Sequence, residues 1–373
     1  MGHCIMVACD HHDKTLVLKL ARGTEPAVKR VFTNDLAGRQ AMRRELLKRS
    51  QAADGAPVIF AYEASGQGFG LYDELTDVGF CCHVLAPTRI ARSPQHRRRK
   101  TDDRDAEQIL ELLRGHVLAG NRLPSVWIPD RSTRDDREVV RTRLDAAEKL
   151  AALKAQVQSL LKRHGMRWTG ESKSWTQPHR RWLDRLSQLD GVLDERPDQS
   201  WGRGAGAALR SLLRQIQSIE KEIEMLDAEV KTLADTPRYA SAVEALVAIK
   251  GVGLLTAMVF LSEVGDLGRF SNRRQIAAYL GLIPSSDESG ERSDRKGHIT
   301  RQGPSRVRKV LCQAVWSAIR TDPKVKATYN KLVRRNPKIK KIAVVACMRR
   351  LSIRMWRRGL ASAGPPSKGT RAA

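Results

Sequence analysis

Acidic side chains stand at three places in the sequence where they could act on a charged substrate. Asp10 follows the apolar run 4–9, and Glu63 follows the apolar run 58–62. Short apolar runs of this kind are typical of buried strands. Because strand ends in an open α/β sheet lie beside the ligand crevice, both carboxylates are expected there. Asp102 and Asp105 stand three residues apart at the start of an expected helix, so they share one helix face.

Four carboxylates that converge at one place would repel one another unless cations neutralised their charge. Hard oxygen ligands of this kind suit Mg²⁺ or Mn²⁺. Two such ions can activate a nucleophile and stabilise a leaving oxygen in phosphodiester chemistry. A set of acids at this edge therefore favours a site for divalent metal.

Each acid taken alone also has a simpler interpretation. A carboxylate at a strand end is more often solvated or a cap, and Asp102 could simply favour the start of its helix. Asp103 is an alternative to either of its neighbours. His11, His12 and Asp13 crowd the first acid, and we interpret them as exposed residues or as neighbours of the ligands.

Strands and helices alternate in the N-terminal third, which indicates an α/β layer. Apolar runs predict strands over 4–9, 16–20, 28–32, 58–62 and 81–85, with helices over 36–50 and 71–78. Thr101 is a plausible N-cap for the helix that carries the third and fourth acids. A long helix is expected from about 135 to 164, and residues 165–205 fit no clear element.

A regular apolar seam follows, with spacings that alternate between three and four residues. Its members are Leu209, Leu212, Ile216, Ile219, Ile223, Leu226, Val230 and Leu233. Such a heptad pattern is typical of a coiled coil, formed within the chain or between chains. An amphipathic helix on an ordinary core is the alternative, but the spacing never slips, which favours the coiled coil.

The 373 residues carry a formal net charge of +26. Charge that far from zero favours a polyanionic partner, with nucleic acid the first candidate and an anionic membrane the second. No apolar run reaches the roughly 18 residues that a membrane span needs, and no secretion signal is evident. The six cysteines form no CxxC pair, which is typical of reduced thiols in the cytoplasm rather than of a zinc finger.

Positive charge concentrates in the last third of the sequence. Between residues 295 and 358, roughly twenty lysine and arginine residues accompany a single acid, Asp322. Salt bridges within the chain cannot balance this excess, so we expect a surface that faces phosphates. Lys338, Lys340 and Lys341 are candidate members of that surface. The tail 361–373 is expected to be disordered.

A Gly-Val-Gly turn at 251–253 separates two expected helices, and Lys250 precedes it. The pattern resembles a helix-hairpin-helix, in which Gly251 and Gly253 would let backbone N–H groups approach a phosphate. A plain turn between two helices is equally compatible with the spacing.

Two strings extend the pattern of the acids. Residues 63–66 read Glu-Ala-Ser-Gly, and residues 100–106 read Lys-Thr-Asp-Asp-Arg-Asp-Ala. Together with Asp10 after its apolar run, they resemble the DEDD-type insertion-sequence transposases, called the IS one-ten family, some of which are bridge-RNA-guided recombinases. The resemblance implies a catalytic, metal-binding tetrad of Asp10, Glu63, Asp102 and Asp105. Ser65 departs from the usual threonine of the family.

The C-terminal half resembles the transposase domain of the same family. The matching strings are 269–270, 275–284, 288–290, 300–303 and 306–308. The family's nucleophilic serine lies in the Ser-Gly pair after a Gly-Leu-x-Pro turn, which implies Ser289 here. A loop serine beside glycine is more often a turn former. The residues alone leave other serines equally available, namely Ser285, Ser286 and Ser293. The basic residues of the matching strings are further candidate nucleic-acid contacts, namely Arg301, Arg306 and Arg308.

The resemblance implies an RNase H-like (RuvC-like) α/β metal-binding domain over 1–165 and a linker or insertion with a coiled coil over 166–236. An all-α transposase domain with a helix-hairpin-helix-like turn would follow over 237–360. The expected enzyme is a DNA transposase or site-specific recombinase that uses Mg²⁺ or Mn²⁺ and forms a phosphoserine intermediate during insertion and excision of an insertion sequence. Its expected partners are element and target DNA, a structured non-coding guide RNA and further copies of itself (a dimer or tetramer), at the bacterial nucleoid and without a membrane.

Three rival interpretations use part of the same pattern. A metal-dependent RuvC-like junction nuclease would use the same acids with water as nucleophile and would leave Ser289 idle. A non-catalytic nucleic-acid-binding protein would need only the basic C-terminal half. A protein of the membrane surface is disfavoured, because the basic helices lack one continuous apolar face with aromatic anchors.

Overall fold

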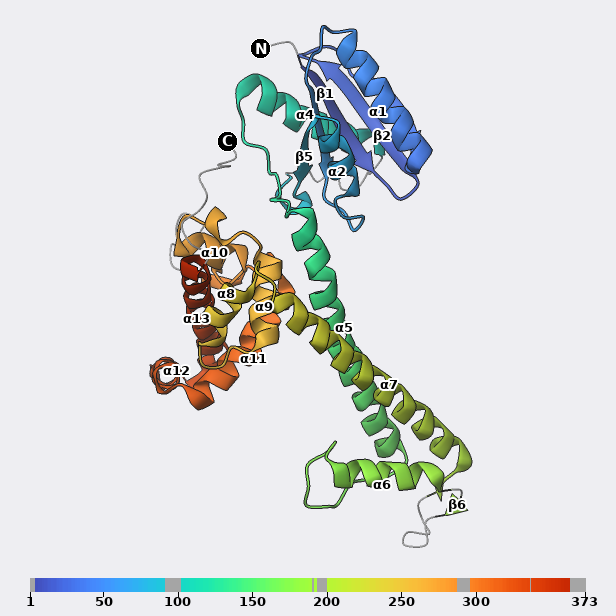
Figure 1. The fold of residues 1–373 in the computed structure, drawn as a ribbon, viewed down its shortest axis with the longest axis vertical. Coiled ribbons are helices and arrows are strands. Elements are labelled where there is room, and N and C mark those ends of the chain that lie inside the picture. The colour runs from blue at the N-terminus through green and yellow to red at the C-terminus, as the bar shows by residue number, and fades with distance from the viewer. Residues whose placement is uncertain are drawn as a thin grey trace. The chain divides into compact units, whose positions relative to one another are not determined.

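Two compact units divide the chain, one over residues 1–128 and the other over 129–373. The computed structural model describes residues 4–90, 102–189, 191–192, 200–286, 296–335 and 337–362 (Figure 1). The boundary at 128 differs from the boundary at 165 that the family resemblance implies, because the long helix after Pro129 packs with the second unit. The family-based boundary stays a prediction. The tail expected to be disordered lies outside the described residues, except for 361 and 362.

The first unit alternates strands and helices as the sequence predicts. Its elements are β1 (Ile5–His11), β2 (Thr15–Arg22), β3 (Val28–Thr33), α1 (Leu36–Gln51), β4 (Val58–Glu63), α2 (Gly70–Asp77), β5 (Cys81–Leu85), the 3-10 turn η1 (Pro87–Arg89) and α4 (Asp102–Ala119). The strands form a single sheet in the order β3-β2-β1-β4-β5. Strands β1, β2 and β3 pair antiparallel, whereas β4 runs parallel to both β1 and β5.

Helices cover both faces of this sheet, since side chains alternate between the faces along each strand. On one face, Val7, Cys9 and Phe60 pack with residues of α1 and α2. On the other face, Met6 and Ala8 pack with residues of α4. The helix predicted over 36–50 is confirmed, and two of its leucines, Leu36 and Leu47, are exposed.

The second unit is helical apart from two short pairs of strands. Its elements are α5 (Arg131–Arg163), α6 (Gln177–Gln188), β6 (Gly191–Val192), β7 (Ser200–Trp201), α7 (Arg203–Ala234), α8 (Ala240–Val247), α9 (Leu254–Val264), η2 (Leu267–Arg269), α10 (Arg273–Tyr279), β8 (Pro284–Ser286), β9 (Lys296–Ile299), α11 (Ser305–Thr321), α12 (Pro323–Arg335), η3 (Pro337–Ile339) and α13 (Lys340–Ser362). Helix α5 starts earlier than predicted because Asp130 accepts a hydrogen bond from the Thr133 N–H at 2.6 Å and so caps the helix.

Helices α5 and α7 lie side by side as an antiparallel hairpin (Figure 1). Two ion pairs fix its direction, because Arg143 meets Asp227 at 2.7 Å while Lys154, further along α5, meets the earlier Glu220 at 3.1 Å. The apolar seam of α7 faces into this packing. Three of its members are buried, namely Leu209, Ile216 and Val230, and the other five are half-buried. Pairing between chains through this seam stays a prediction.

The segment that the sequence left unassigned builds the end of this hairpin. Helix α6 packs on α7, and the fully buried Trp201 joins Leu183 and Leu186 in an apolar cluster with the end of α5. Arg180 of α6 forms a two-pronged hydrogen bond to Glu220, at 2.7 and 2.8 Å. The described parts of this segment therefore share an apolar core with α5 and α7 at this end of the hairpin.

A larger apolar core unites the start of α5 with α8, α9, α11 and α13. The turn between α8 and α9 lies against this core, because Gly251 packs directly on α11. A Cβ atom added at Gly251 would lie 2.6 Å from the Ala314 carbonyl oxygen and 2.8 Å from the Ala318 nitrogen. The backbone there also has a φ of +90°, a conformation that glycine adopts most easily.

None of the helices in the described ranges is both long and apolar enough to cross a membrane.

The Arg180–Glu220 contact predicts a pH-dependent contribution to stability. The hydrogen bond from Arg180 lowers the pKa of Glu220 from 4.5 to about 2, against the opposing effect of burial. A carboxylate with a lowered folded-state pKa stabilises the fold above its ordinary pKa and loses that effect as the pH falls. In urea unfolding, wild type should exceed Glu220→Gln in stability above pH 4.5, and the gap should close toward pH 2. Glu224→Gln, an exposed change on the same helix, should show no such gap.

The packing of Gly251 predicts that an added methyl group is costly. Gly251→Ala combines a left-handed backbone with a clash in a filled site, so the free energy of unfolding should fall by about 2–5 kcal/mol. A Cβ atom added at Gly253 would meet no atom within 4 Å. The control Gly253→Ala should therefore cost about 1 kcal/mol or less, as for a change of N-cap residue. Equal losses in chemical denaturation would contradict the packing argument.

Candidate functional site

Asp10 and Glu63 are neighbours at one edge of the sheet. Strands β1 and β4 pair in parallel from Ile5 with Val58 to Cys9 with Tyr62, so the next position in register sets Asp10 beside Glu63. Adjacent strands lie about 4.8 Å apart. This register places the two acids side by side at the carboxyl ends of parallel strands, and their joint role at a site stays a prediction.

Alternation along the strands also decides the face on which these acids lie. Asp10 continues the series of Met6 and Ala8, whose side chains pack on the α4 face. Glu63 pairs in register with Leu85, which belongs to the same apolar cluster. Both acids are half-buried. They therefore share the face of the sheet that α4 covers.

Helix α4, which carries Asp102 and Asp105 in the sequence, covers this face. It packs against β1, β2 and β4, with Ala106, Ile109 and Leu113 buried on its sheet side. Asp105 is half-buried and stands one helical turn before Ile109. Asp102 is the first residue of the helix, and its side chain lies outside the described atoms, as does that of Asp103.

The proposed donor set suits a hard divalent cation in its chemistry, since it consists of carboxylates from two strand ends and from the first turn of α4. Within the described part of the chain, no group of three or more histidine, cysteine, aspartate or glutamate residues stands close enough to hold a metal ion. The tetrad as a metal site stays a prediction that rests on backbone placement and on the resemblance.

Histidines flank the first acid in two different ways. His12 Nε2 lies 3.0 Å from Asp10 Oδ2, so this neighbour contacts the candidate ligand directly. The His11 ring instead meets Tyr62 edge to face at 5.4 Å between ring centroids. Burial lowers the pKa of His11, which favours the neutral ring there. The sequence predicts both histidines near the site, and in the structure His12 is the one that contacts Asp10.

Ser289 and Ser293 lie outside the described residues, but the stem that carries their segment is described. Strands β8 and β9 pair antiparallel, with Pro284 opposite Ile299 and Ser286 opposite Lys296. The Ser285 hydroxyl donates a hydrogen bond to the His298 carbonyl at 3.0 Å. Among the alternative serines, Ser285 is therefore engaged in the stem itself.

The strings that carry the C-terminal resemblance hold the base of this stem. Gly281 and Gly303 both have positive φ angles, and each packs against backbone atoms of the facing string. Arg308 of α11 donates to the carbonyls of Leu280, Gln302 and Gly303 at 2.9–3.2 Å. These contacts tie the start and the end of the hairpin to one helix.

The predicted nucleic-acid contacts divide into exposed and internally bonded residues. Lys250, Lys338, Lys340, Lys341, Gly253 and Arg301 are exposed. Arg306 forms an ion pair with Asp145 of α5 at 3.1 Å, and Arg308 bonds the carbonyls named above. Gly251 packs on α11. For these last three the structure shows a scaffold role, and a contact with nucleic acid stays a prediction.

One cluster of basic residues was not predicted from the sequence. Lys324 of α12 and Arg350 and Arg354 of α13 line a common pocket. They come from two helices separated by a turn, so no spacing in the sequence could have joined them.

Two models of transposase families match this chain. Residues 7–166 match the DEDD-type transposase model of the IS110 group, described as "Transposase", and residues 243–330 match the family described as "Transposase IS116/IS110/IS902 family". The first match includes β1, β4 and α4, which carry the four acids. The second includes the stem around Ser289.

Individual relatives extend over most of the chain. "Putative transposase y4rJ" of Sinorhizobium fredii is 31% identical over 79% of this chain and 74% of its own length. "Putative transposase y4qE" of the same organism is 36% identical over 70% of this chain, which spans only 58% of that relative. The "Transposase for insertion sequence element IS1533" of Leptospira borgpetersenii is 25% identical over 68% of this chain and 69% of its own length.

The fold and these matches fit together. A mixed α/β sheet domain comes first and a helical region follows, as the DEDD transposase match leads one to expect. The chain is a member of the IS110 family of insertion-sequence transposases.

Proposed function

We propose that this protein is a DNA recombinase that cuts and rejoins the ends of an insertion sequence through a phosphoserine intermediate at Ser289. Membership of a transposase family supports DNA as the substrate. The observation that carries the proposal is the register of β1 and β4, which sets Asp10 beside Glu63 on the face covered by the helix of Asp102 and Asp105. Divalent ions held by such carboxylates can activate a nucleophile and stabilise a leaving oxygen in phosphodiester chemistry.

These four carboxylates would hold Mg²⁺ or Mn²⁺, which supplies charge stabilisation for an attacking and a leaving oxygen on phosphorus. The protein's own part is to fix the positions of the acids. Parallel pairing fixes the first two, and packing of α4 on the sheet fixes the helix that carries the others. His12, in contact with Asp10, orients that carboxylate.

The serine chemistry conserves the energy of the phosphodiester bond. The Ser289 oxygen attacks the phosphorus, a new Ser–O–P bond forms, and the bond to the 3′ oxygen breaks. The serine proton passes in net terms to that oxygen, which leaves as a 3′ hydroxyl. Attack of a 3′ hydroxyl from another strand then reverses the step, restores Ser289 and joins the new pair of strands. A serine hydroxyl needs activation for this attack.

The partners of this reaction follow from charge and from the resemblance. The net charge of +26 suits binding of nucleic acid, and the exposed Lys338, Lys340 and Lys341 supply positive charge near the start of α13. A structured guide RNA would choose the DNA sites by base pairing. A dimer or tetramer would let the acids of one copy work with Ser289 of another.

The tetrad predicts a loss of cleavage without a loss of DNA binding. Asp10→Asn and Asp105→Asn should each slow strand cleavage by about a hundredfold or more, since each removes a ligand charge. DNA affinity should change little, because lysine and arginine residues supply the phosphate contacts. Cleavage of element-end DNA in Mg²⁺ and in EDTA, with binding measured in parallel, tests this.

Asp13→Asn is the matched control for these variants. Asp13 is exposed in the turn after β1, so the same change of charge occurs close to the site without touching a proposed ligand. This variant should cleave like wild type. Full activity of the tetrad variants, or activity of wild type in excess EDTA, would refute the metal site.

Ser289 predicts a covalent link between protein and DNA. On a substrate nicked near the crossover, wild type should trap a DNA-linked chain that survives boiling in detergent, and peptide mapping should place the link at Ser289. Ser289→Ala should lose the link and recombination while keeping fold and DNA affinity. Ser285→Ala and Ser293→Ala are the controls and should retain both activities. Strand cutting without any link would instead favour the nuclease that uses water.

A further inference from the structure

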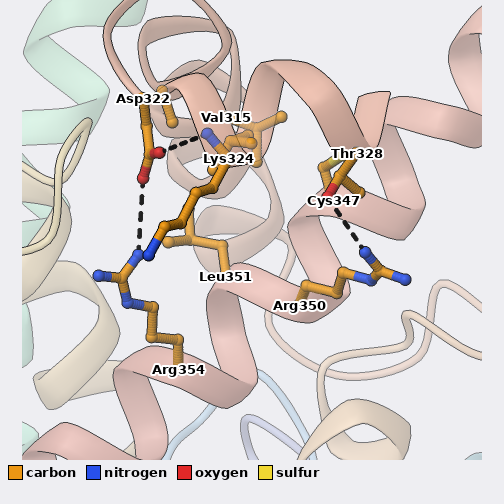
Figure 2. A pocket seen from close by; sticks show the side chains of 10 residues that line it. Val315, Asp322, Lys324, Thr328, Cys347, Arg350, Leu351 and Arg354 are labelled. Carbon is orange, nitrogen blue, oxygen red and sulfur yellow. Dashed lines mark hydrogen bonds and ion pairs between the residues drawn. The ribbon is translucent and has the colours of Figure 1, made fainter. Parts of the chain in front are cut away.

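A pocket opens between α11, α12 and α13 on the basic C-terminal half of the chain (Figure 2). Its volume is about 160 Å³. The walls are mainly apolar, formed by Val315, Ala318, Val325 and Leu351. Cavities of roughly 150 Å³ with apolar walls accept a single benzene-sized ring. The pocket therefore has the size and the lining for one small aromatic ring.

Three cations stand around this apolar space. Lys324, Arg350 and Arg354 all line the pocket. Figure 2 shows the Lys324 side chain extending toward the Arg354 guanidinium group. Arg350 donates a hydrogen bond to the Thr328 hydroxyl at 3.3 Å, which holds its guanidinium group at the other side. Gathering of like charges in one place favours an anionic occupant.

Asp322 is the only acid that lines the pocket, and it is largely committed to the fold. It is buried, and one of its oxygens accepts a hydrogen bond from the Lys324 backbone N–H at 2.9 Å at the start of α12. Arg354 lies 3.7 Å from the other oxygen. A carboxylate has about four acceptor positions, so Asp322 keeps capacity for a further donor beside these two contacts. The excess of positive charge in the pocket therefore remains.

An apolar slot for one ring, a cationic rim and one acceptor together match the parts of a nucleotide. Bases that leave the helical stack are held between apolar side chains and read along their hydrogen-bonding edge, while arginine and lysine hold the backbone. A free phosphate would not need the apolar walls. An apolar peptide side chain would not need the three cations.

We propose that this pocket binds one unpaired nucleotide, with the base between the apolar walls and the flanking phosphates on Lys324, Arg350 and Arg354. The volume favours a pyrimidine over a purine. Unpaired nucleotides arise in strand exchange and in the loops of a structured RNA, so the inference rests on the proposed recombinase function. It adds to that function a binding site for a base that lies outside the helical stack.

The experiment measures binding of fluorescent oligonucleotides to the full-length protein by anisotropy. The probes are an oligothymidylate, an oligouridylate, an oligothymidylate with abasic positions, and a duplex. The abasic probe should bind about tenfold more weakly than the intact strand, in line with the loss of one base contact. Crosslinks from 5-iodouracil should map to peptides of α12 or α13.

Two matched pairs of variants separate the pocket from general charge. Arg354→Gln is compared with Arg357→Gln, which removes the same charge from an exposed place on the same helix. Val325→Trp fills the pocket without a change of charge, and Ala327→Trp adds the same ring at an exposed position of α12. Thermal melting of the four variants, compared with wild type, checks that each is folded.

The pocket variants should weaken single-strand binding about tenfold relative to their controls and leave duplex binding equal within each pair. Tighter binding of the uridylate would assign the pocket to RNA, and tighter binding of the thymidylate to a displaced DNA strand. Equal binding of each variant and its control, or equal losses for duplex and single strand, would overturn the inference. Strand cleavage by wild type is measured in the same samples. If wild type cleaves DNA but the pocket variants bind like their controls, the nucleotide-pocket proposal is refuted and the recombinase proposal is not.

Discussion

Parallel pairing between β1 and β4 is the constraint on which the candidate catalytic site depends. It sets Asp10 beside Glu63, and the two-residue period of a strand sends both to the α4 face. A slip of one residue would turn one of these acids to the face of α1 and α2, among apolar side chains. The buried runs before each acid lock the register, because Cys9 and Phe60 must face α1 and α2 while Ala8 and Ala61 face α4. The chemistry thus depends on how the core is filled.

In the C-terminal half, most residues of the strings that resemble the family hold other parts of the chain in place. Gly281, Gly303 and Arg308 bring both ends of the β8–β9 stem to the start of α11. Arg269 stacks over the rings of Phe270 and Tyr279 at 4.2 and 4.3 Å, and burial lowers the pKa of its guanidinium group. A reactive serine on a loop is better positioned when both ends of the loop are held in this way, because effective attack needs a restricted approach. Family strings can therefore mark the scaffold of a site as much as its reacting groups.

In the second unit, the buried charged groups are paired or hydrogen-bonded inside the fold, and exposed basic residues remain on the surface. Arg137 and Arg141 of α5 meet the C-terminal end of α9, where Arg137 bonds the carbonyls of Ser262 and Glu263 and Arg141 bonds the Glu263 carboxylate at 2.7 and 2.9 Å. Partly buried charge is tolerated when it is paired and hydrogen-bonded in this way. Asp322, the single acid between residues 295 and 358, is likewise used inside the fold. The remaining lysine and arginine residues leave the C-terminal surface strongly positive, as binding to a polyanion requires.

Local patterns in the sequence were enough to predict the strands and helices of the first unit and the helical seam of α7, whereas the choice of the four acids rests on the family resemblance. Apolar alternation and periodicity report which side of an element is buried, and this information lies within a few residues of chain. These local patterns did not predict which elements pack together when they are distant in the sequence. Tertiary packing decided that α7 lies on α5 and that Trp201 joins α5, α6 and α7 in one apolar cluster. It also decided that Gly251 faces α11 and that Lys324 shares a pocket with Arg354. The physical reason is that close packing depends on shape across elements, and a one-dimensional pattern records only that a face is apolar, not which surface will cover it.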